Sequence, residues 1–184
     1  MREPRIVSRD IVAALVPYGT PQEIKAGTTI YLTQSLGGSH TAVTDMGYMV
    51  RIDGKDADAI GEQLDTPPTS EEIKDKPLDQ VVWDRLKTCY DPEIPVNIVD
   101  LGLVYSVAVT DVEAQVTAPA GKKITVRFAL TAPGCGMGDV LKQDIIRKVS
   151  ELPTVVESDV DVTFDPPWTQ ELMSDAARLQ LGLM

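Results

Sequence analysis

Residues 124–138 read ITVRFALTAPGCGMG, in which an alternating apolar pattern gives way to a glycine-rich turn. Every second position of the first half is apolar, which is the period of a half-buried strand: Ile124, Val126, Phe128 and Leu130. Beyond the turn, apolar residues recur at helical spacing: Met137, Val140, Leu141, Ile145, Val149 and Leu152. The pattern therefore predicts a strand, a glycine loop and a helix, with Cys135 at or just before the first helical turn.

Two interpretations of Cys135 follow from this position. The unpaired N–H groups and the positive end of the helix dipole favour a reactive or metal-binding thiolate. The flanking residues Gly134 and Gly136 carry no side chain, so another molecule can approach the sulfur closely. Free cysteine is also among the most buried residue types, so a structural role fits equally well. Cys89 continues the helical stripe of Leu78, Val82 and Leu86, which predicts a core position.

Composition limits the class of protein. The chain has 184 residues, 43% of them apolar, which suits one domain or two small ones. No stretch approaches the roughly 18 apolar residues of a membrane span, and no secretory signal is recognisable. Two cysteines in dissimilar contexts do not make a disulfide framework, so we expect a cytoplasmic protein. The net charge of −11 argues against binding to nucleic acid or to an anionic membrane.

The chain divides into two parts on sequence grounds. Residues 1–62 form a small β-rich module with short strand-like runs at 28–33 and 47–52. Residues 63–76 contain two prolines among polar residues and are predicted to be a linker. Residues 77–184 form the larger unit. The predicted class is α/β (α+β), a small domain with a short mixed sheet and three helices, preceded by the β-rich module.

Inside the larger unit, periodicity and turn signals place the elements in order. They are a helix at 78–90, a strand from about Leu101, paired strands at 112–117 and 124–130, the helix after Cys135, a strand at 159–164 and a helix at 169–179.

The loop at residues 91–100 is the second region with chemical potential. It carries three carboxylates and an amide on backbone that prolines hold extended: Asp91, Glu93, Asn97 and Asp100. Carboxylate oxygens suit hard metal ions, and a thiolate suits softer metals and iron–sulfur species. If the loop folds beside Cys135, the two together form a mixed oxygen and sulfur site. The competing interpretation is that Asp91 and Asn97 cap turns and that Glu93 is solvated, which the loop alone favours.

His40 is the sole histidine of the chain, so no Ser-His-Asp triad or Cys-His pair can form without it. Its setting after Gly37 and Gly38 predicts an ordinary turn residue. Trp168, after two prolines, is predicted to be a packing anchor. The glycine spacing around Cys135 does not match a dinucleotide fingerprint.

Three segments in this order and spacing resemble the metal–sulfur cluster biosynthesis domain family of SufT- and PaaD-type proteins. The segments are Asp91–Tyr105, Thr131–Cys135 and Asp165–Trp168, and the resemblance spans residues 78–184. Residues 34–39 and 51–61 are similar to the N-terminal extension of SufT-like members.

The resemblance implies an accessory or targeting role in iron–sulfur protein maturation and not an enzyme. It implies that the acidic loop approaches the cysteine, with Cys135 as the functional thiol and with Asp91, Glu93 and Asp100 as the acidic motif. Asn97, Thr131, Gly134 and Gly136 are supporting positions. Implied partners are iron–sulfur client proteins and the cluster assembly machinery.

The ligand count restricts this expectation. A four-iron cluster is normally held by four thiolates, and the chain offers one plausible ligand, Cys135. We therefore expect no stably bound cofactor, and a cluster or iron held transiently, across a homodimer, or jointly with a client. Two other functions remain open: an interaction adaptor with a structural Cys135, and a thiol redox enzyme or sensor. The thiol redox enzyme or sensor would lack the partner cysteine of a CxxC pair.

Overall fold

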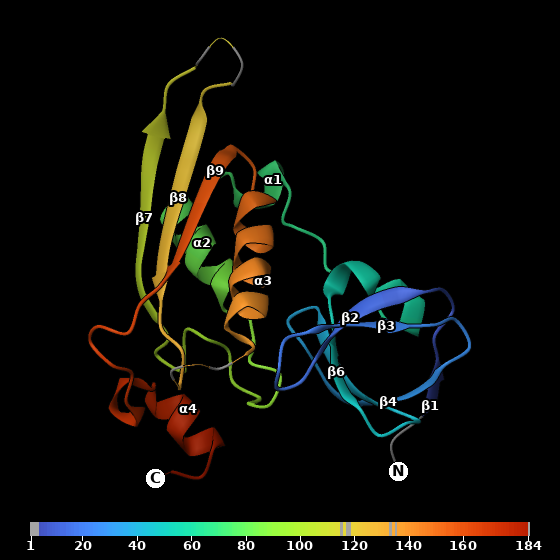
Figure 1. Cartoon of the computed structure of the whole chain (residues 1–184). Coiled ribbons are helices and arrows are strands. Elements are labelled where there is room, and N and C mark those ends of the chain that lie inside the picture. The colour runs from blue at the N-terminus through green and yellow to red at the C-terminus, as the bar shows by residue number, and fades with distance from the viewer. Residues whose placement is uncertain (1–3, 115, 117–118, 133, 135, 184) are drawn as a thin grey trace.

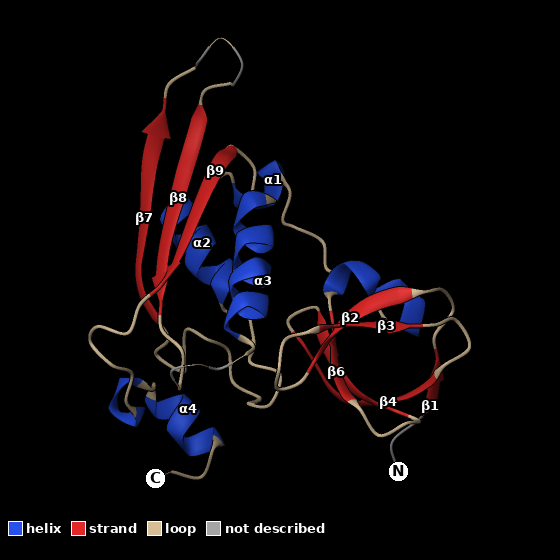
Figure 2. Ribbon diagram, viewed as in Figure 1, coloured by secondary structure: helices blue, strands red, loops and turns tan. Residues whose placement is uncertain are grey.

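The computed structural model describes residues 4–114, 116, 119–132, 134 and 136–183 (Figure 1). Within them the strands form two sheets, one in each half of the chain, and helices pack against the second sheet (Figure 2). The mixed α/β class predicted from sequence is confirmed, including the short mixed sheet. None of the described helices combines the length and apolar character needed to cross a membrane.

The N-terminal half is a six-stranded antiparallel sheet that curls into a barrel-like roll (Figure 1). The strands follow the order β1-β4-β5-β6-β2-β3. Their bounds are β1 Pro4–Ile6, β2 Ile11–Leu15, β3 Pro21–Ile24, β4 Thr29–Leu36, β5 Ser39–Thr44 and β6 Met49–Ile52. We call this unit the barrel. Its core is made of aliphatic side chains, among them Ile30, Ala42, Val50 and Ile52.

A short helical segment, η1 (Gly54–Ile60), packs against the barrel and contributes Ala59 and Ile60 to its core. The residues predicted to be a linker contain a further helix, α1 (Ser70–Ile73). That helix begins with a capping box, in which Thr69 and Glu72 satisfy each other's backbone N–H groups.

The second sheet has the order β7-β8-β9, with bounds Val104–Val112, Gly121–Phe128 and Val155–Val162. β7 and β8 are an antiparallel hairpin, whereas β8 and β9 are parallel and joined through helix α3 (Gly138–Ser150). Helices α2 (Leu78–Leu86) and α3 cover one face (Figure 2). Ile124, Val126 and Phe128 point to that face and are fully buried, as the alternation predicts.

Several sequence predictions for the larger unit were wrong in their bounds. The strand expected from about Leu101 is β7, which runs from Val104 to Val112 and pairs with β8. The separate strand expected over 112–117 is not found at its described residues 113, 114 and 116. The strand expected over 159–164 is β9, which begins earlier, at Val155. The helix expected over 78–90 ends at Leu86. The final helix is interrupted: a short turn, η2 (Gln170–Leu172), is followed by extended backbone at Met173. Ser174 then caps α4 (Asp175–Gln180), and its hydroxyl accepts from Ala177 N–H.

Candidate functional site

The segments singled out by sequence meet at one end of the second sheet. β8 and β9 are parallel, so both finish at this end, where β7 and α3 begin (Figure 1). Just beyond the acidic loop, Leu103 C=O accepts a 2.7 Å hydrogen bond from Ala129 N–H. Phe128 C=O accepts a 2.8 Å bond from Thr163 N–H. The acidic loop, the cysteine-bearing loop and the Asp165–Trp168 segment therefore leave the sheet side by side.

The acidic loop is shaped by its own polar side chains. Asp91 Oδ1 accepts from the N–H groups of Glu93, at 2.9 Å, and Ile94, at 3.3 Å. Asn97 Oδ1 accepts from the N–H groups of Val99, at 3.1 Å, and Asp100, at 2.9 Å. These are the turn-capping contacts of the structural interpretation. Glu93 differs from both because it is exposed to solvent.

Asp100 receives a further contact, because Asn97 Nδ2 donates a 2.6 Å hydrogen bond to Asp100 Oδ2. Both residues line a small cavity of about 160 Å³ against α4. Neither side chain is free to leave its turn without losing bonds within the loop, so the loop presents a fixed shape.

The Asp165–Trp168 segment supports the acidic loop. Trp168 Nε1 donates a 2.8 Å hydrogen bond to Leu101 C=O, and its ring packs against the core of the unit. Tyr105 hydroxyl donates to Pro166 C=O at 2.9 Å. Trp168 is therefore the packing anchor that the sequence predicts, and it also fixes the loop through its indole N–H.

The cysteine-bearing loop is described in part. Thr131 is half-buried three residues after β8, and Gly134 adopts a left-handed φ of 78° with open space around it. Gly136 lies against the backbone of the barrel turn at Tyr18. Cys135 lies outside the described residues, as does Pro133. The structure thus brings the two loops to one end of the sheet, and the contact of Cys135 with the carboxylates stays a prediction.

His40 is not a turn residue, contrary to the sequence prediction. The turn at Gly37 and Gly38 ends before it, and His40 lies in β5, buried, with Nδ1 2.8 Å from Ser35 Oγ. Burial lowers the pKa of His40, and the nearby Glu62 partly opposes that shift. Among the described residues there is no cluster of three or more His, Cys, Asp or Glu side chains that could hold a metal ion.

Cys89 is fully buried after α2, as predicted. Burial, assisted by the negative charge of Asp144, raises the pKa of its thiol to about 12. The Cys89 thiol is therefore protonated and shielded from solvent near neutral pH, so this residue should not react.

We expect iodoacetamide at pH 8 to alkylate the native chain once, at Cys135, because the Cys89 thiol is buried and protonated. Intact-mass and peptide mass spectrometry would check this, with a urea-denatured sample taking two labels as the control. A label on Cys89 in the native chain would contradict it.

Sequence reasoning missed the polar residues that join the barrel to α3. Asp144 and Lys148 lie on the buried stripe of α3 with Leu141, Ile145 and Val149, and both are almost without exposure. Asp144 pairs with Arg51 of β6 at 2.9 Å. The sequence gives one indication of this pairing, because Asp144 and Lys148 are charged, lie four residues apart and fall on the apolar side of the helical pattern.

Comparison with known proteins adds the family context. A family model described as iron–sulfur cluster assembly protein matches residues 79–162. An Fe-S protein maturation auxiliary factor of Porphyromonas gingivalis is 41% identical over 99 residues, covering 54% of this chain and 86% of that protein. The Fe-S protein maturation auxiliary factor SufT of Staphylococcus aureus is 36% identical over 93 residues, which cover 50% of this chain and 96% of that protein. A domain of unknown function from Bacillus anthracis, solved as a crystal structure, is 32% identical in sequence and has a TM-score of 0.48. The match covers 58% of this chain and 92% of that one.

The family model begins in α2 and ends in β9, so it coincides with the second sheet and its two covering helices. The barrel lies outside that match, and its similarity to the extension of SufT-like members stays a prediction.

Proposed function

Because this chain belongs to the SufT-like family of iron–sulfur cluster assembly proteins, we propose that it is an accessory factor in the maturation of iron–sulfur proteins. In this proposal it helps clusters to be assembled, transferred or targeted to client proteins in the cytoplasm, and it is not an enzyme. Its partners are the clients and the assembly machinery. Cys135 supplies the thiol that meets the cluster or iron, which is cargo and not a resident cofactor.

One observation supports this site above all others. The hydrogen bond from Ala129 N–H to Leu103 C=O aligns the acidic loop with the strand that leads into the cysteine-bearing loop. Two segments that are about 40 residues apart in sequence therefore emerge together at one end of the sheet. A thiolate and a solvent-facing carboxylate at the same end combine a soft ligand with a hard one.

The side chains of the acidic loop differ in their hydrogen bonding. Asp91, Asn97 and Asp100 use side-chain oxygens in the turns that shape the loop. Glu93 is exposed and enters the Asp91 turn only through its backbone N–H, so in this proposal its carboxylate meets iron or a client's basic group. One thiol and one carboxylate are too few ligands to hold a four-iron cluster on this chain alone. The site therefore suits a cluster or iron that is held transiently or shared with another chain.

The same turn-capping contacts also favour a second candidate, an adaptor that recruits clients and whose cysteine is structural. In that case the acidic loop acts through its shape alone. The two candidates differ in what they require of the Glu93 charge and of the Cys135 thiol.

Cells that lack this chain are expected to lose activity of cluster-dependent enzymes while cluster-free enzymes keep theirs. The wild-type chain should restore the activity, and Glu93→Gln should restore clearly less of it because the carboxylate charge is gone. Glu113→Gln is the matched control, since Glu113 is an exposed carboxylate in the β7–β8 hairpin at the opposite end of the sheet. Enzyme activities in extracts, normalised to the amount of this chain, provide the measurement.

Unchanged cluster-enzyme activity in cells that lack the chain would overturn the maturation role. Equal restoration by the Glu93 and Glu113 variants would remove the carboxylate from the mechanism and favour the adaptor.

A further inference from the structure

The barrel is attached to the α/β unit by buried charge. Arg51 Nη2 of β6 lies 2.9 Å from Asp144 Oδ2 of α3, and the two side chains are 4% and 1% exposed. Lys148 is fully buried, and its ammonium donates to Gly37 C=O of the barrel at 2.6 Å and to Thr88 C=O at 2.5 Å. Buried charges hold their partners in one geometry, because separating them leaves an unpaired charge without water. The two units thus form one body.

The barrel also touches the cysteine-bearing loop directly, backbone to backbone. Gly19 has a left-handed φ of 71°, and a Cβ there would lie 2.0 Å from the carbonyl oxygen of Gly136. A Cβ on Gly136 would in turn lie 2.5 Å from the carbonyl oxygen of Tyr18. The approach therefore depends on the absence of a side chain at both positions.

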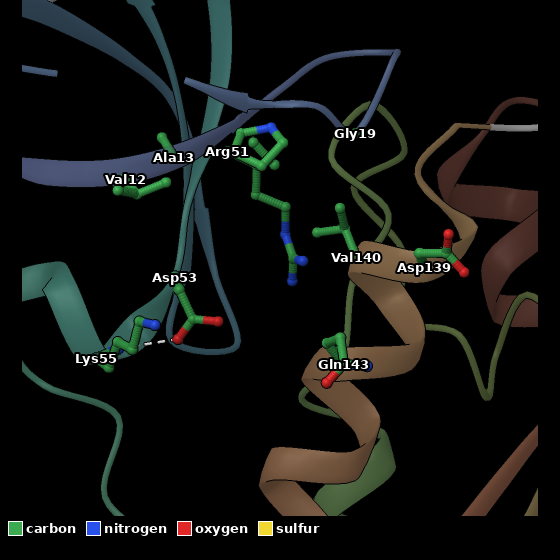
Figure 3. A pocket seen from close by; sticks show the side chains of 11 residues that line it. Val12, Ala13, Gly19, Arg51, Asp53, Lys55, Asp139, Val140 and Gln143 are labelled. Atoms are coloured by element: carbon green, nitrogen blue, oxygen red, sulfur yellow. Dashed lines mark hydrogen bonds between the residues drawn. The ribbon is translucent and has the colours of Figure 1, made fainter. Parts of the chain in front are cut away.

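This contact is small and discrete. Beside the Gly19–Gly136 contact, a cavity of about 310 Å³ separates the barrel from α3. Arg51 lines the cavity on the barrel side, and Val140 and Gln143 of α3 line it on the opposite side (Figure 3). A change at Gly19 thus acts on the loop that follows Cys135 in sequence and not on a broad interface.

The same barrel holds the acidic loop. Gln34 Nε2 of β4 donates to Asp91 C=O at 3.1 Å, and Thr41 hydroxyl of the neighbouring strand β5 donates to Pro92 C=O at 3.2 Å. The barrel is therefore in contact with both motif loops, although it lies outside the region that the family model matches.

We propose that the barrel is a brace that sets the position of the cysteine-bearing loop relative to the acidic loop, with the Gly19–Gly136 contact as its point of action. The inference rests on the proposed function for its purpose, because two ligand groups that share one cargo must be held at a fixed separation. The brace itself is a physical property that can be measured without any cluster.

The test compares Gly19→Asn with Gly27→Asn. Asparagine tolerates left-handed backbone better than most residues, so the comparison isolates the added side chain. Gly27 has a φ of 87° and lies in the same barrel, and beyond its chain neighbours no heavy atom of the described residues lies within 4 Å of the position that a Cβ would take. We expect Gly19→Asn to speed alkylation of Cys135 by iodoacetamide about threefold or more, because the loop is released into more open conformations. Gly27→Asn should react at the wild-type rate.

Equal alkylation rates in these two variants, with folding confirmed by circular dichroism, would overturn the brace. If Gly19→Asn does not fold, the contact can be broken from the other side by Gly136→Ala. Its control is again Gly27→Asn, whose side chain enters open space away from the cysteine-bearing loop. Gly136→Ala should react faster than Gly27→Asn, and an equal or slower rate would again overturn the proposal. These rates are independent of cluster maturation, so failure of the proposed function leaves them unchanged.

Discussion

Asp144→Asn is expected to lower the free energy of unfolding by about 3–5 kcal/mol, the range for breaking a buried ion pair from one side. The carboxylate is 1% exposed and lies 2.9 Å from Arg51, 3.0 Å from Arg147 and 3.6 Å from Lys148. Asparagine has nearly the same size, so the loss arises from the missing charge and not from a cavity. Arg51 and Lys148 would stay buried without their counter-charge. Urea unfolding at neutral pH, followed by circular dichroism, measures the change.

The loss of unfolding free energy in Asp144→Asn should depend on pH and become smaller in acid. Burial by itself raises the pKa of Asp144, but the positive charges of Arg51, Lys148 and Arg147 outweigh it and hold the pKa below its ordinary value. A carboxyl whose folded pKa is lowered stabilises the fold above its unfolded pKa, near 4, and that contribution disappears as the pH falls through the folded pKa. The gap between wild type and Asp144→Asn should therefore narrow below about pH 4.

Asp139→Asn is the control for this prediction, because Asp139 lies on the same helix but is exposed. Its unfolding free energy should stay within about 0.5 kcal/mol of wild type. A loss in Asp144→Asn no larger than in Asp139→Asn would contradict the view that buried charge fixes the barrel to α3.

Local periodicity was enough to predict the framework of the larger unit. The alternation through Ile124, Val126 and Phe128 predicts a strand with one buried face, and the spacing after Cys135 predicts a helix, because both patterns reflect which face meets the core. The bounds were less predictable. Ser174 is a strong N-cap residue, and its position in the sequence indicates a helix that begins at Asp175 and not at Thr169.

Polar residues that act over long sequence distances could not be predicted in the same way. In the barrel, Asp144 pairs with Arg51, which is 93 residues away in sequence, and no local pattern pairs the two. The bond between Ala129 and Leu103, which aligns the two loops, is likewise a product of sheet register. The turn caps of Asp91 and Asn97 were predictable because each bonds to backbone within three residues.

Cys135→Ser is expected to reduce the activity of cluster-dependent enzymes to the level of cells that lack the chain. A serine hydroxyl stays protonated near neutral pH and offers a hard oxygen, so it replaces neither the nucleophilicity nor the soft-metal affinity of a thiolate. The substitution keeps the size of the side chain, and the amount of folded chain in the cell should be unchanged. The assay is the ratio of a cluster-dependent enzyme to a cluster-free one in cells that carry the variant.

Met46→Ser provides the control, since Met46 is an exposed sulfur-containing side chain of the barrel and carries no assigned role. It should support full activity. Restoration by Cys135→Ser equal to that of Met46→Ser would remove the thiol from the mechanism and leave the adaptor as the function of the site. Loss of activity in Cys135→Ser together with normal binding of clients, measured by co-purification, would separate handling of the cluster from recognition of the client. We expect that separation because the acidic loop and the cysteine-bearing loop lie at one end of the sheet, away from its solvent-facing side and from the outer strands of the barrel.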